Sequence, residues 1–126
     1  MASGEVNEAY EFGKFAEIKA SEEYVKKGFA ILERRWRHGK NEVDLIVQKG
    51  NIVAFVEVKA RSGRHMMPLE AITSDKKRRM VKSADSYLRK LQGDYDYRFD
   101  FVAVTGTTEN FSIEILEDAF LAADIF

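Results

Sequence analysis

The pattern of apolar and polar residues along the chain predicts two helices and several strands. Helical spacing followed by Gly28 predicts a first helix over residues 7–27. Short runs rich in β-branched and aromatic residues predict strands at 29–36, 42–48, 51–59, 98–105 and 111–115. An apolar stripe with a 3.6-residue period predicts a second helix from Thr73 or Ser74 to about Leu91.

The order of these elements is α-β-β-β-α-β-β, followed by a tail over residues 116–126 that we expect to form a short helix. Such an order predicts an α/β fold in α+β style, in which helices pack on a mixed β-sheet. No repeat or linker divides the 126 residues, so we expect a single domain over residues 1–126.

Composition narrows the class of protein. The chain has no cysteine, which excludes disulfide scaffolds, thiol nucleophiles and cysteine-ligated zinc. The longest strictly apolar run, residues 52–56, is far too short to cross a bilayer, and residues 1–9 lack a signal-peptide pattern. We therefore expect a cytoplasmic protein that does not interact with membranes.

Charge is distributed unevenly along the chain. The net charge of −1 combines a value of +10 for residues 26–90 with −4 for residues 1–25 and −7 for residues 91–126. A strongly cationic middle favours a polyanionic partner, although the oppositely charged lobes can also pair with each other.

Acids embedded in apolar strands are the most informative feature. A two-residue turn at Lys49-Gly50 would place Asp44 opposite Phe55, and Asp44 would then share a face with Glu57 and Lys59. Glu57 and Asp44 would lie roughly 7–8 Å apart between Cα atoms. A three-residue turn would instead put the two carboxylates on opposite faces.

Two carboxylates at this separation can share a hard divalent cation such as Mg²⁺ or Mn²⁺. The bound ion would activate a water molecule, and Lys59 would orient that water or neutralise a phosphate. The set therefore predicts phosphodiester hydrolysis. The alternative is an acid–base pair on a half-exposed sheet, which contributes little energy.

Glu17 is a candidate third acid. It falls within the small-residue face of the first helix, which also carries Gly13, Ala16 and Ala20. This position suits either a carboxylate that approaches the site or a rim glutamate that extends to water.

An ordered set of motifs covers nearly the whole chain. These motifs are Ala16-Glu17, Asn41-Glu42-Val43-Asp44-Leu45-Ile46, Val56-Glu57-Val58-Lys59 with Arg61, Pro68 with Glu70-Ala71, and Arg98-Phe99-Asp100. Together they resemble the YraN family of small predicted endonucleases, which belongs to the restriction-endonuclease-like PD-(D/E)xK superfamily and is distantly similar to archaeal Holliday-junction resolvases.

The resemblance implies a restriction-endonuclease-like αβββαβ core and a metal-dependent endonuclease. It implies that Asp44 and Glu57 bind the metal and that Lys59 is the catalytic lysine. Glu17 would be the helix acid of the site and Glu42 a supporting acid.

Basic residues flank the proposed catalytic strands, as expected for contacts to phosphates. The candidates for nucleic-acid binding are Arg35, Arg37, Lys40, Arg61, Arg64, Lys76 and Arg79. We expect the substrate to be DNA rather than RNA, with branched or flapped DNA as candidates.

Two other functions stay open. One is a non-catalytic nucleic-acid-binding or assembly module that retains the nuclease fold. The other is a protein-interaction domain, because apolar residues at 120–126 are suited to an interface, including that of a homodimer.

Overall fold

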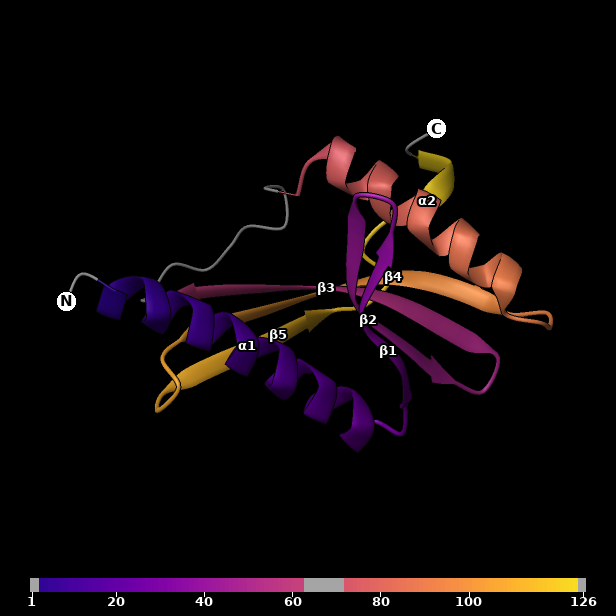
Figure 1. Cartoon of the computed structure of the whole chain (residues 1–126). Helices are drawn as coiled ribbons and strands as arrows, with labels where there is room; N and C mark the ends of the chain where they lie inside the picture. Colours follow the sequence, from indigo (N-terminus) through magenta and orange to yellow (C-terminus); the bar gives the residue numbers. More distant parts are fainter. Residues whose placement is uncertain (1–2, 63–71, 125–126) are drawn as a thin grey trace.

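The computed structural model describes residues 3–62 and 72–124 of the chain. Within these ranges it contains the helices α1 (Ser3–Lys26) and α2 (Ser74–Lys90). One sheet is formed by β1 (Ala30–His38), β2 (Asn41–Lys49), β3 (Ile52–Ser62), β4 (Asp96–Gly106) and β5 (Phe111–Leu116). The predicted order of helices and strands is confirmed, and Figure 1 shows their arrangement.

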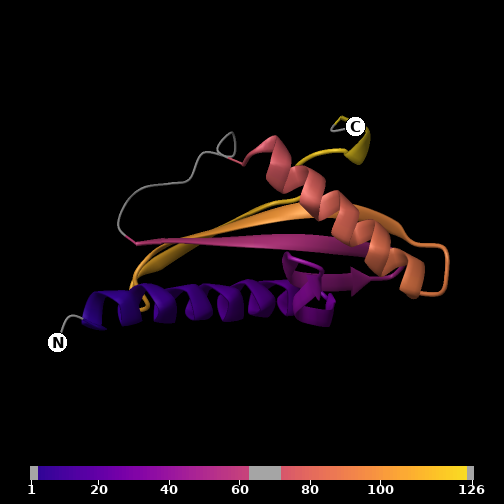
Figure 2. The ribbon, with the colours of Figure 1, turned by 45° about the horizontal axis from the view of Figure 1, so that its top comes forward.

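The sheet is mixed, with the strand order β1-β2-β3-β4-β5. Neighbouring strands are antiparallel except β3 and β4, which are parallel and are connected through α2. The first six elements follow the αβββαβ order that the family resemblance implies. Figure 2 shows α1 on one face of the sheet and α2 on the other, which is an α+β arrangement.

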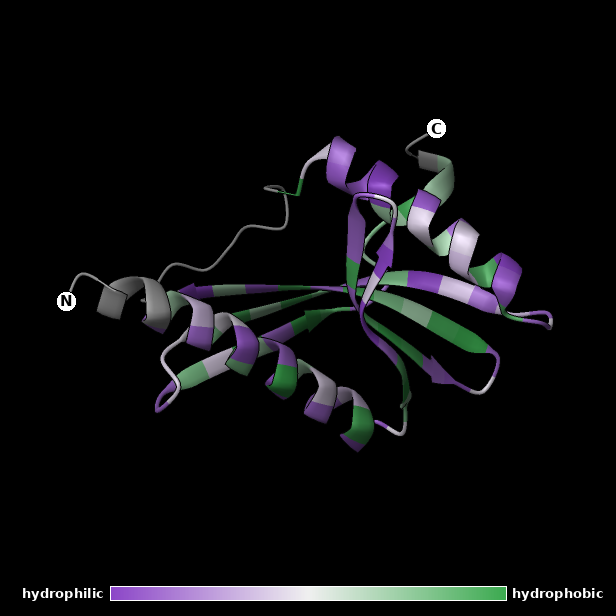
Figure 3. Ribbon diagram, viewed as in Figure 1, coloured by the Kyte–Doolittle hydropathy of each residue, from purple (hydrophilic) through white to green (hydrophobic). Residues whose placement is uncertain are grey.

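Each face of the sheet buries its own core. On the α1 face, Ala16 and Ala20 are fully buried, and their small side chains let the helix lie close to the strands. On the α2 face, aromatic residues such as Phe55 and Phe99 pack against Met80 of the helix. Figure 3 shows apolar residues along the central strands and hydrophilic residues on the first turns of α2.

The turn between β2 and β3 differs from the prediction. It is formed by Gly50 and Asn51 rather than by Lys49 and Gly50, so that Lys49 pairs with Ile52. Gly50 has a φ of +61°, a left-handed conformation that glycine adopts without strain. The pairing therefore shifts by two residues, and a shift of two leaves Asp44 on the same face as Glu57.

The β1–β2 hairpin bends away from the sheet near Asp44. Pairing between β2 and β3 ends at Leu45, whereas pairing between β1 and β2 continues to His38 and Asn41. Leu45 packs on the α1 side but Val43 packs on the α2 side, so strict alternation breaks between them. The hairpin tip consequently approaches α2, as Figure 1 shows.

The C-terminal segment differs from the predicted helix over 116–126. Within the described residues, β5 extends to Leu116 and a single 3₁₀ turn follows at Ala122–Asp124. Phe120 is buried and stacks on Phe99, with ring centroids 4.6 Å apart. Packing of Phe120 against the sheet accounts for part of the apolar character of this segment.

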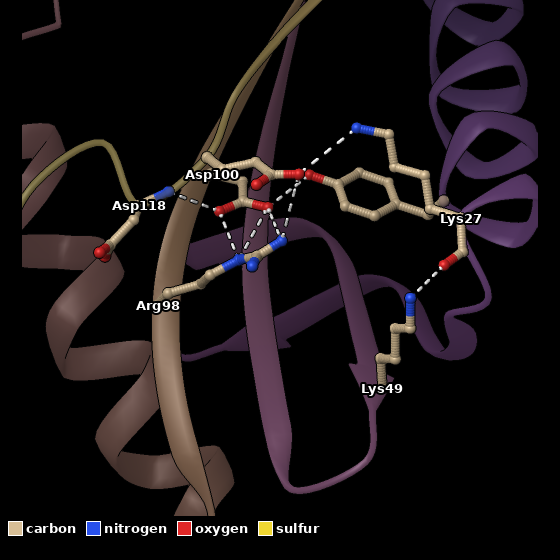
Figure 4. Close-up of polar contacts among 7 residues, drawn as sticks. Lys27, Lys49, Arg98, Asp100 and Asp118 are labelled. Atoms are coloured by element: carbon tan, nitrogen blue, oxygen red, sulfur yellow. Dashed lines mark hydrogen bonds and ion pairs between the residues drawn. The ribbon is translucent and has the colours of Figure 1, made fainter.

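A buried ionic cluster connects α1, β4 and the segment after β5 (Figure 4). Asp100 is fully buried, and its carboxylate accepts hydrogen bonds from the Tyr24 hydroxyl at 2.7 Å and from the Arg98 guanidinium. The Asp118 backbone N–H donates a further bond at 3.0 Å. Burial and the Asp100 charge raise the pKa of Tyr24. This cluster explains the Arg98-Phe99-Asp100 motif as a structural element.

Neither α1 nor α2, the α-helices of the described ranges, has an apolar stretch of the length that crossing a bilayer requires.

Candidate active site

Asp44 lies where β2 separates from β3. Because the ladder ends at Leu45 and Val56, Asp44 and Glu57 are the next positions on neighbouring strands. Asp44 Oδ2 accepts a hydrogen bond of 2.7 Å from the Val58 N–H, a donor that a strand carbonyl would satisfy in a continuous ladder. This bond fixes the orientation of the Asp44 carboxylate beside Glu57.

The surroundings raise the pKa of Asp44 to about 7. Burial is the main cause, since it disfavours the charged carboxylate, and the negative charge of Glu57 is the second. The Val58 N–H and the ammonium of Lys76 oppose the shift, while Glu17 adds to it. A raised carboxyl pKa next to a second carboxylate is typical of functional sites.

Glu57 is 5% exposed and lies between two lysines. Its Oε2 atom is 2.9 Å from Nζ of Lys76 on α2, and its Oε1 atom is 3.8 Å from Nζ of Lys59 on β3. Glu57 Oε2 is buried and has no hydrogen bond of regular geometry to any residue that the structure describes, so the Lys76 contact is an ion pair. A buried carboxylate needs such cations, because its desolvation is costly.

The donor set of Asp44 and Glu57 fits a divalent cation that prefers oxygen. Mg²⁺ typically binds one or two protein carboxylates and keeps several waters. Within residues 3–62 and 72–124, no group of three or more His, Cys, Asp or Glu side chains is arranged to hold a metal ion. Carboxylate oxygens are the ligands that Mg²⁺ and Mn²⁺ prefer, so the pair could hold one such ion.

The structure places the other predicted acids at the margin of this pair. Glu17 is close enough to raise the pKa of Asp44, but its carboxylate is 2.9 Å from the Arg35 guanidinium. Glu42 is 3.4 Å from the Arg37 guanidinium. Both acids thus have arginine partners of their own, and only Asp44 and Glu57 are adjacent across the two strands.

The predicted nucleic-acid-binding residues separate into groups. Arg35 and Arg37 are paired with acids, and Lys76 is paired with Glu57. Arg61 is exposed at the end of β3. Arg64 lies outside the described residues.

A cavity of about 250 Å³ lies between the hairpin tip and α2. Its lining comprises Lys40, Asn41, Glu42, Asp44, Lys76, Arg79, Met80 and Ser83. It thus brings together three predicted phosphate contacts and one of the two candidate metal ligands.

Ser83 is a cavity residue that the sequence reasoning missed. It is 1% exposed, and its Oγ atom has no hydrogen-bond partner in the described part of the chain. Ser83 follows Met80 by three residues and precedes Tyr87 by four, so it lies within the apolar stripe of the helix. A polar residue in that stripe is the feature of the sequence from which a buried hydroxyl could have been predicted.

Comparisons with known proteins identify relatives of the chain. The sequence model of the uncharacterised protein family UPF0102 matches residues 16–104, a range that includes the candidate site. A UPF0102 protein of Phocaeicola vulgatus is 40% identical over 111 residues, which cover 87% of this chain and 92% of that protein. A UPF0102 protein of Chloroherpeton thalassium is 43% identical over 120 residues, which cover 91% of this chain and 92% of that protein. The names of these relatives state no activity.

Proposed function

We propose, from the premise that this chain belongs to the uncharacterised protein family UPF0102, that it is a metal-dependent nuclease acting on phosphodiester bonds. UPF0102 is the YraN family that the sequence motifs resemble. The observation that carries the proposal is the placement of Asp44 and Glu57 at adjacent positions of β2 and β3. Mg²⁺ or Mn²⁺ is the expected cofactor and DNA the expected substrate.

Asp44 and Glu57 would hold the divalent ion, which when bound lowers the pKa of a coordinated water and stabilises charge on a phosphoryl group. The Val58 N–H keeps the Asp44 carboxylate in a fixed orientation, so little ordering is needed when the ion binds. Lys59 lies beside Glu57 with a side chain that is 44% exposed. Its ammonium can therefore reach a phosphate or an attacking water above the sheet.

The basic residues near the pair would position the substrate. Lys40 on the hairpin and Arg79 on α2 line opposite sides of the cavity that contains Asp44. Contacts from such residues to backbone phosphates position a nucleic acid without reading its sequence. Binding that depends on several of them is expected to weaken steeply with salt.

The test is cleavage of labelled linear, flapped and four-way DNA with Mg²⁺, Mn²⁺ or EDTA. We expect metal-dependent cleavage of at least one substrate, with loss of activity in Asp44→Asn and Glu57→Gln. Glu114→Gln, on the far edge strand β5, is the matched control and should keep full activity, because it removes an exposed carboxylate outside the site.

Lys59→Met provides a second check on the same preparation. We expect loss of cleavage with retained metal binding, since Lys59 is assigned to the phosphate or the water rather than to the ion. Equal residual activity in the unmodified protein, Asp44→Asn and Glu57→Gln would show that the activity comes from a contaminant, and the nuclease assignment would then be rejected.

A non-catalytic nucleic-acid-binding module is the second candidate, and one observation favours it. Glu57 already has two lysine partners, at 2.9 and 3.8 Å, so its charge is balanced without a metal ion. This candidate predicts DNA binding that is unaffected by EDTA and by Asp44→Asn. The nuclease proposal predicts that both changes alter the affinity for DNA.

A further inference from the structure

The cavity between the hairpin tip and α2 contains a buried hydroxyl. Ser83 lines this cavity and is 1% exposed, and its Oγ atom has no hydrogen-bond partner within residues 3–62 and 72–124. A buried hydroxyl in this state costs free energy unless a water or a ligand bonds to it. Ser83 therefore points to a ligand with hydrogen-bonding oxygens.

The lining of the cavity indicates the charge of that ligand. Lys76, Arg79 and Ser83 are spaced i, i+3 and i+7 along α2, so they lie on one face of the helix, and Lys40 comes from the hairpin. The two acids in the lining have partners of their own, because Glu42 pairs with Arg37, and Asp44 accepts the Val58 N–H and would bind the divalent ion. A guanidinium, an ammonium and a hydroxyl in a row are suited to the oxygens of a phosphate.

Lys76 connects this cavity to the carboxylate pair. It lines the cavity, yet its Nζ atom is 2.9 Å from Oε2 of Glu57, one of the two residues that would hold the divalent ion. A divalent ion held by Glu57 would repel the nearby Lys76 ammonium, so the two cations would compete for this carboxylate. A released Lys76 ammonium would lie on the same helix face as Arg79 and Ser83.

We propose that this cavity is a phosphate-binding subsite for the nucleic-acid backbone, built on Arg79 and Ser83, to which Lys76 moves when a divalent ion replaces it on Glu57. The inference rests on the proposed metal site at Asp44 and Glu57. It makes the binding of the metal and of the polyanion mutually strengthening, by the same factor in each direction.

The experiment measures equilibrium binding rather than turnover. Ca²⁺ and Mn²⁺ affinities are measured by calorimetry without DNA, and the affinity for a fluorescent 20-base-pair duplex is measured by anisotropy in EDTA or in Ca²⁺. A gel at the end of each titration verifies that the duplex is intact. Lys76→Met is compared with Lys82→Met, which removes the same charge from an exposed position of α2 outside the cavity lining.

We expect Lys76→Met to bind the divalent ion about tenfold more tightly in the absence of DNA, because the competing ammonium is gone. The strengthening of duplex binding by Ca²⁺ should be lost in Lys76→Met and kept in Lys82→Met. Equal metal affinities in Lys76→Met and the unmodified protein would overturn the exchange while leaving the metal site intact. No metal binding in either protein would overturn the metal site and the exchange together.

Ser83→Ala tests the subsite without disturbing the carboxylate pair. We expect duplex affinity in Ca²⁺ to fall several-fold, metal affinity to stay unchanged, and thermal stability to stay equal or rise, because an unpaired buried hydroxyl is removed. Unchanged duplex affinity in both Ser83→Ala and Arg79→Gln would overturn the subsite. Inorganic phosphate at millimolar concentration could also compete with the duplex for the protein. If it does so while neither variant changes duplex affinity, the cavity binds free phosphate and the backbone assignment is overturned.

Discussion

Asp100 and Asp44 are both acids in interior parts of the same sheet, but their surroundings differ. Asp100 is fully buried, and its carboxylate receives the Tyr24 hydroxyl, the Arg98 guanidinium and the Asp118 N–H. Asp44 receives the Val58 N–H and lies beside a second acid, and burial together with the charge of Glu57 raises the pKa of Asp44.

The difference separates a structural acid from a candidate functional one. Donors around Asp100 supply the bonds that water would have made, so the ionised side chain holds three chain segments together. Asp44 accepts one N–H and Glu57 lies beside two lysines, so lone pairs of both carboxylates remain available to a ligand. Burial also differs, because Asp100 is fully buried whereas Asp44 keeps partial exposure to solvent.

The largest effect is expected for Asp44→Asn, which should lower activity without lowering stability. Asp44→Asn should reduce metal-dependent cleavage at least about a thousand-fold, since three powers of ten correspond to ~4 kcal/mol of transition-state stabilisation. The asparagine can still accept the Val58 N–H, so the variant should be as stable as the unmodified protein or more stable. Cleavage rates and urea denaturation at one pH measure both quantities. If Asp44→Asn lost stability and activity together, Asp44 would be a structural acid like Asp100.

Asp100→Asn should show the opposite behaviour. Removing the charge leaves the largely buried Arg98 guanidinium without its main partner, and breaking a buried pair in this way costs about 3–5 kcal/mol. The fraction that remains folded should keep its cleavage rate per molecule. Urea denaturation followed by circular dichroism measures the loss, and a change below about 1 kcal/mol would contradict the structural role.

The pH dependence of stability should reflect Asp44. Its pKa is about 7 in the folded protein and 3.8 without the fold, so the folded state holds the proton more tightly. Between these values the unfolded chain loses its proton first, and the unfolding free energy should fall by up to about 4 kcal/mol as pH rises from 4 to 7. Above pH 7 this contribution should level off.

Asp44→Asn is the control for this titration, because it should remove the decline between pH 4 and 7. Thermal melting in EDTA across that range compares the two proteins. Added Mn²⁺ should restore stability at pH 7 in the unmodified protein only, since the ion would bind the ionised Asp44 carboxylate of the folded state. The same decline in Asp44→Asn would assign the pH dependence to other groups.

Glu17→Gln should have the smallest effect. Its ion pair with Arg35 is partly exposed, and such pairs contribute about 0.2–1 kcal/mol. Because Glu17 raises the pKa of Asp44, the variant should shift the end of the stability decline to slightly lower pH. Cleavage should persist. Complete loss of cleavage with normal stability would instead make Glu17 a direct participant in the reaction.

The sequence alone was sufficient to predict that Asp44 and Glu57 lie close together. Strand alternation through Glu57-Val58-Lys59 and a turn near Gly50 predicted that Asp44 would face Glu57, and the structure places them at adjacent positions. The predicted register was wrong by two residues, because the turn uses Gly50 and Asn51. A register error of two residues leaves a side chain on the same face of the sheet, so the predicted proximity of Asp44 and Glu57 did not depend on the exact turn.

The sequence could not supply contacts that depend on the packing of distant elements. Lys76 was predicted as a phosphate contact, yet in the fold its ammonium meets Glu57 across the sheet–helix interface. The bend at Asp44 coincides with a φ of +51° at Arg35, and arginine gives no local signal for such a conformation. Apolar residues in the tail predicted a helix, but Phe120 packs on the sheet instead.

The left-handed backbone at Arg35 sets the stability of the folded chain against a contact that the hairpin makes. Holding a residue with a Cβ atom in this conformation costs roughly 1–2 kcal/mol, which the fold must offset elsewhere. An Arg35→Gly variant would recover part of that cost and would also release the hairpin from its contact with Glu17. Glycine at this position would relieve the backbone cost, whereas arginine keeps the ion pair between the hairpin and α1.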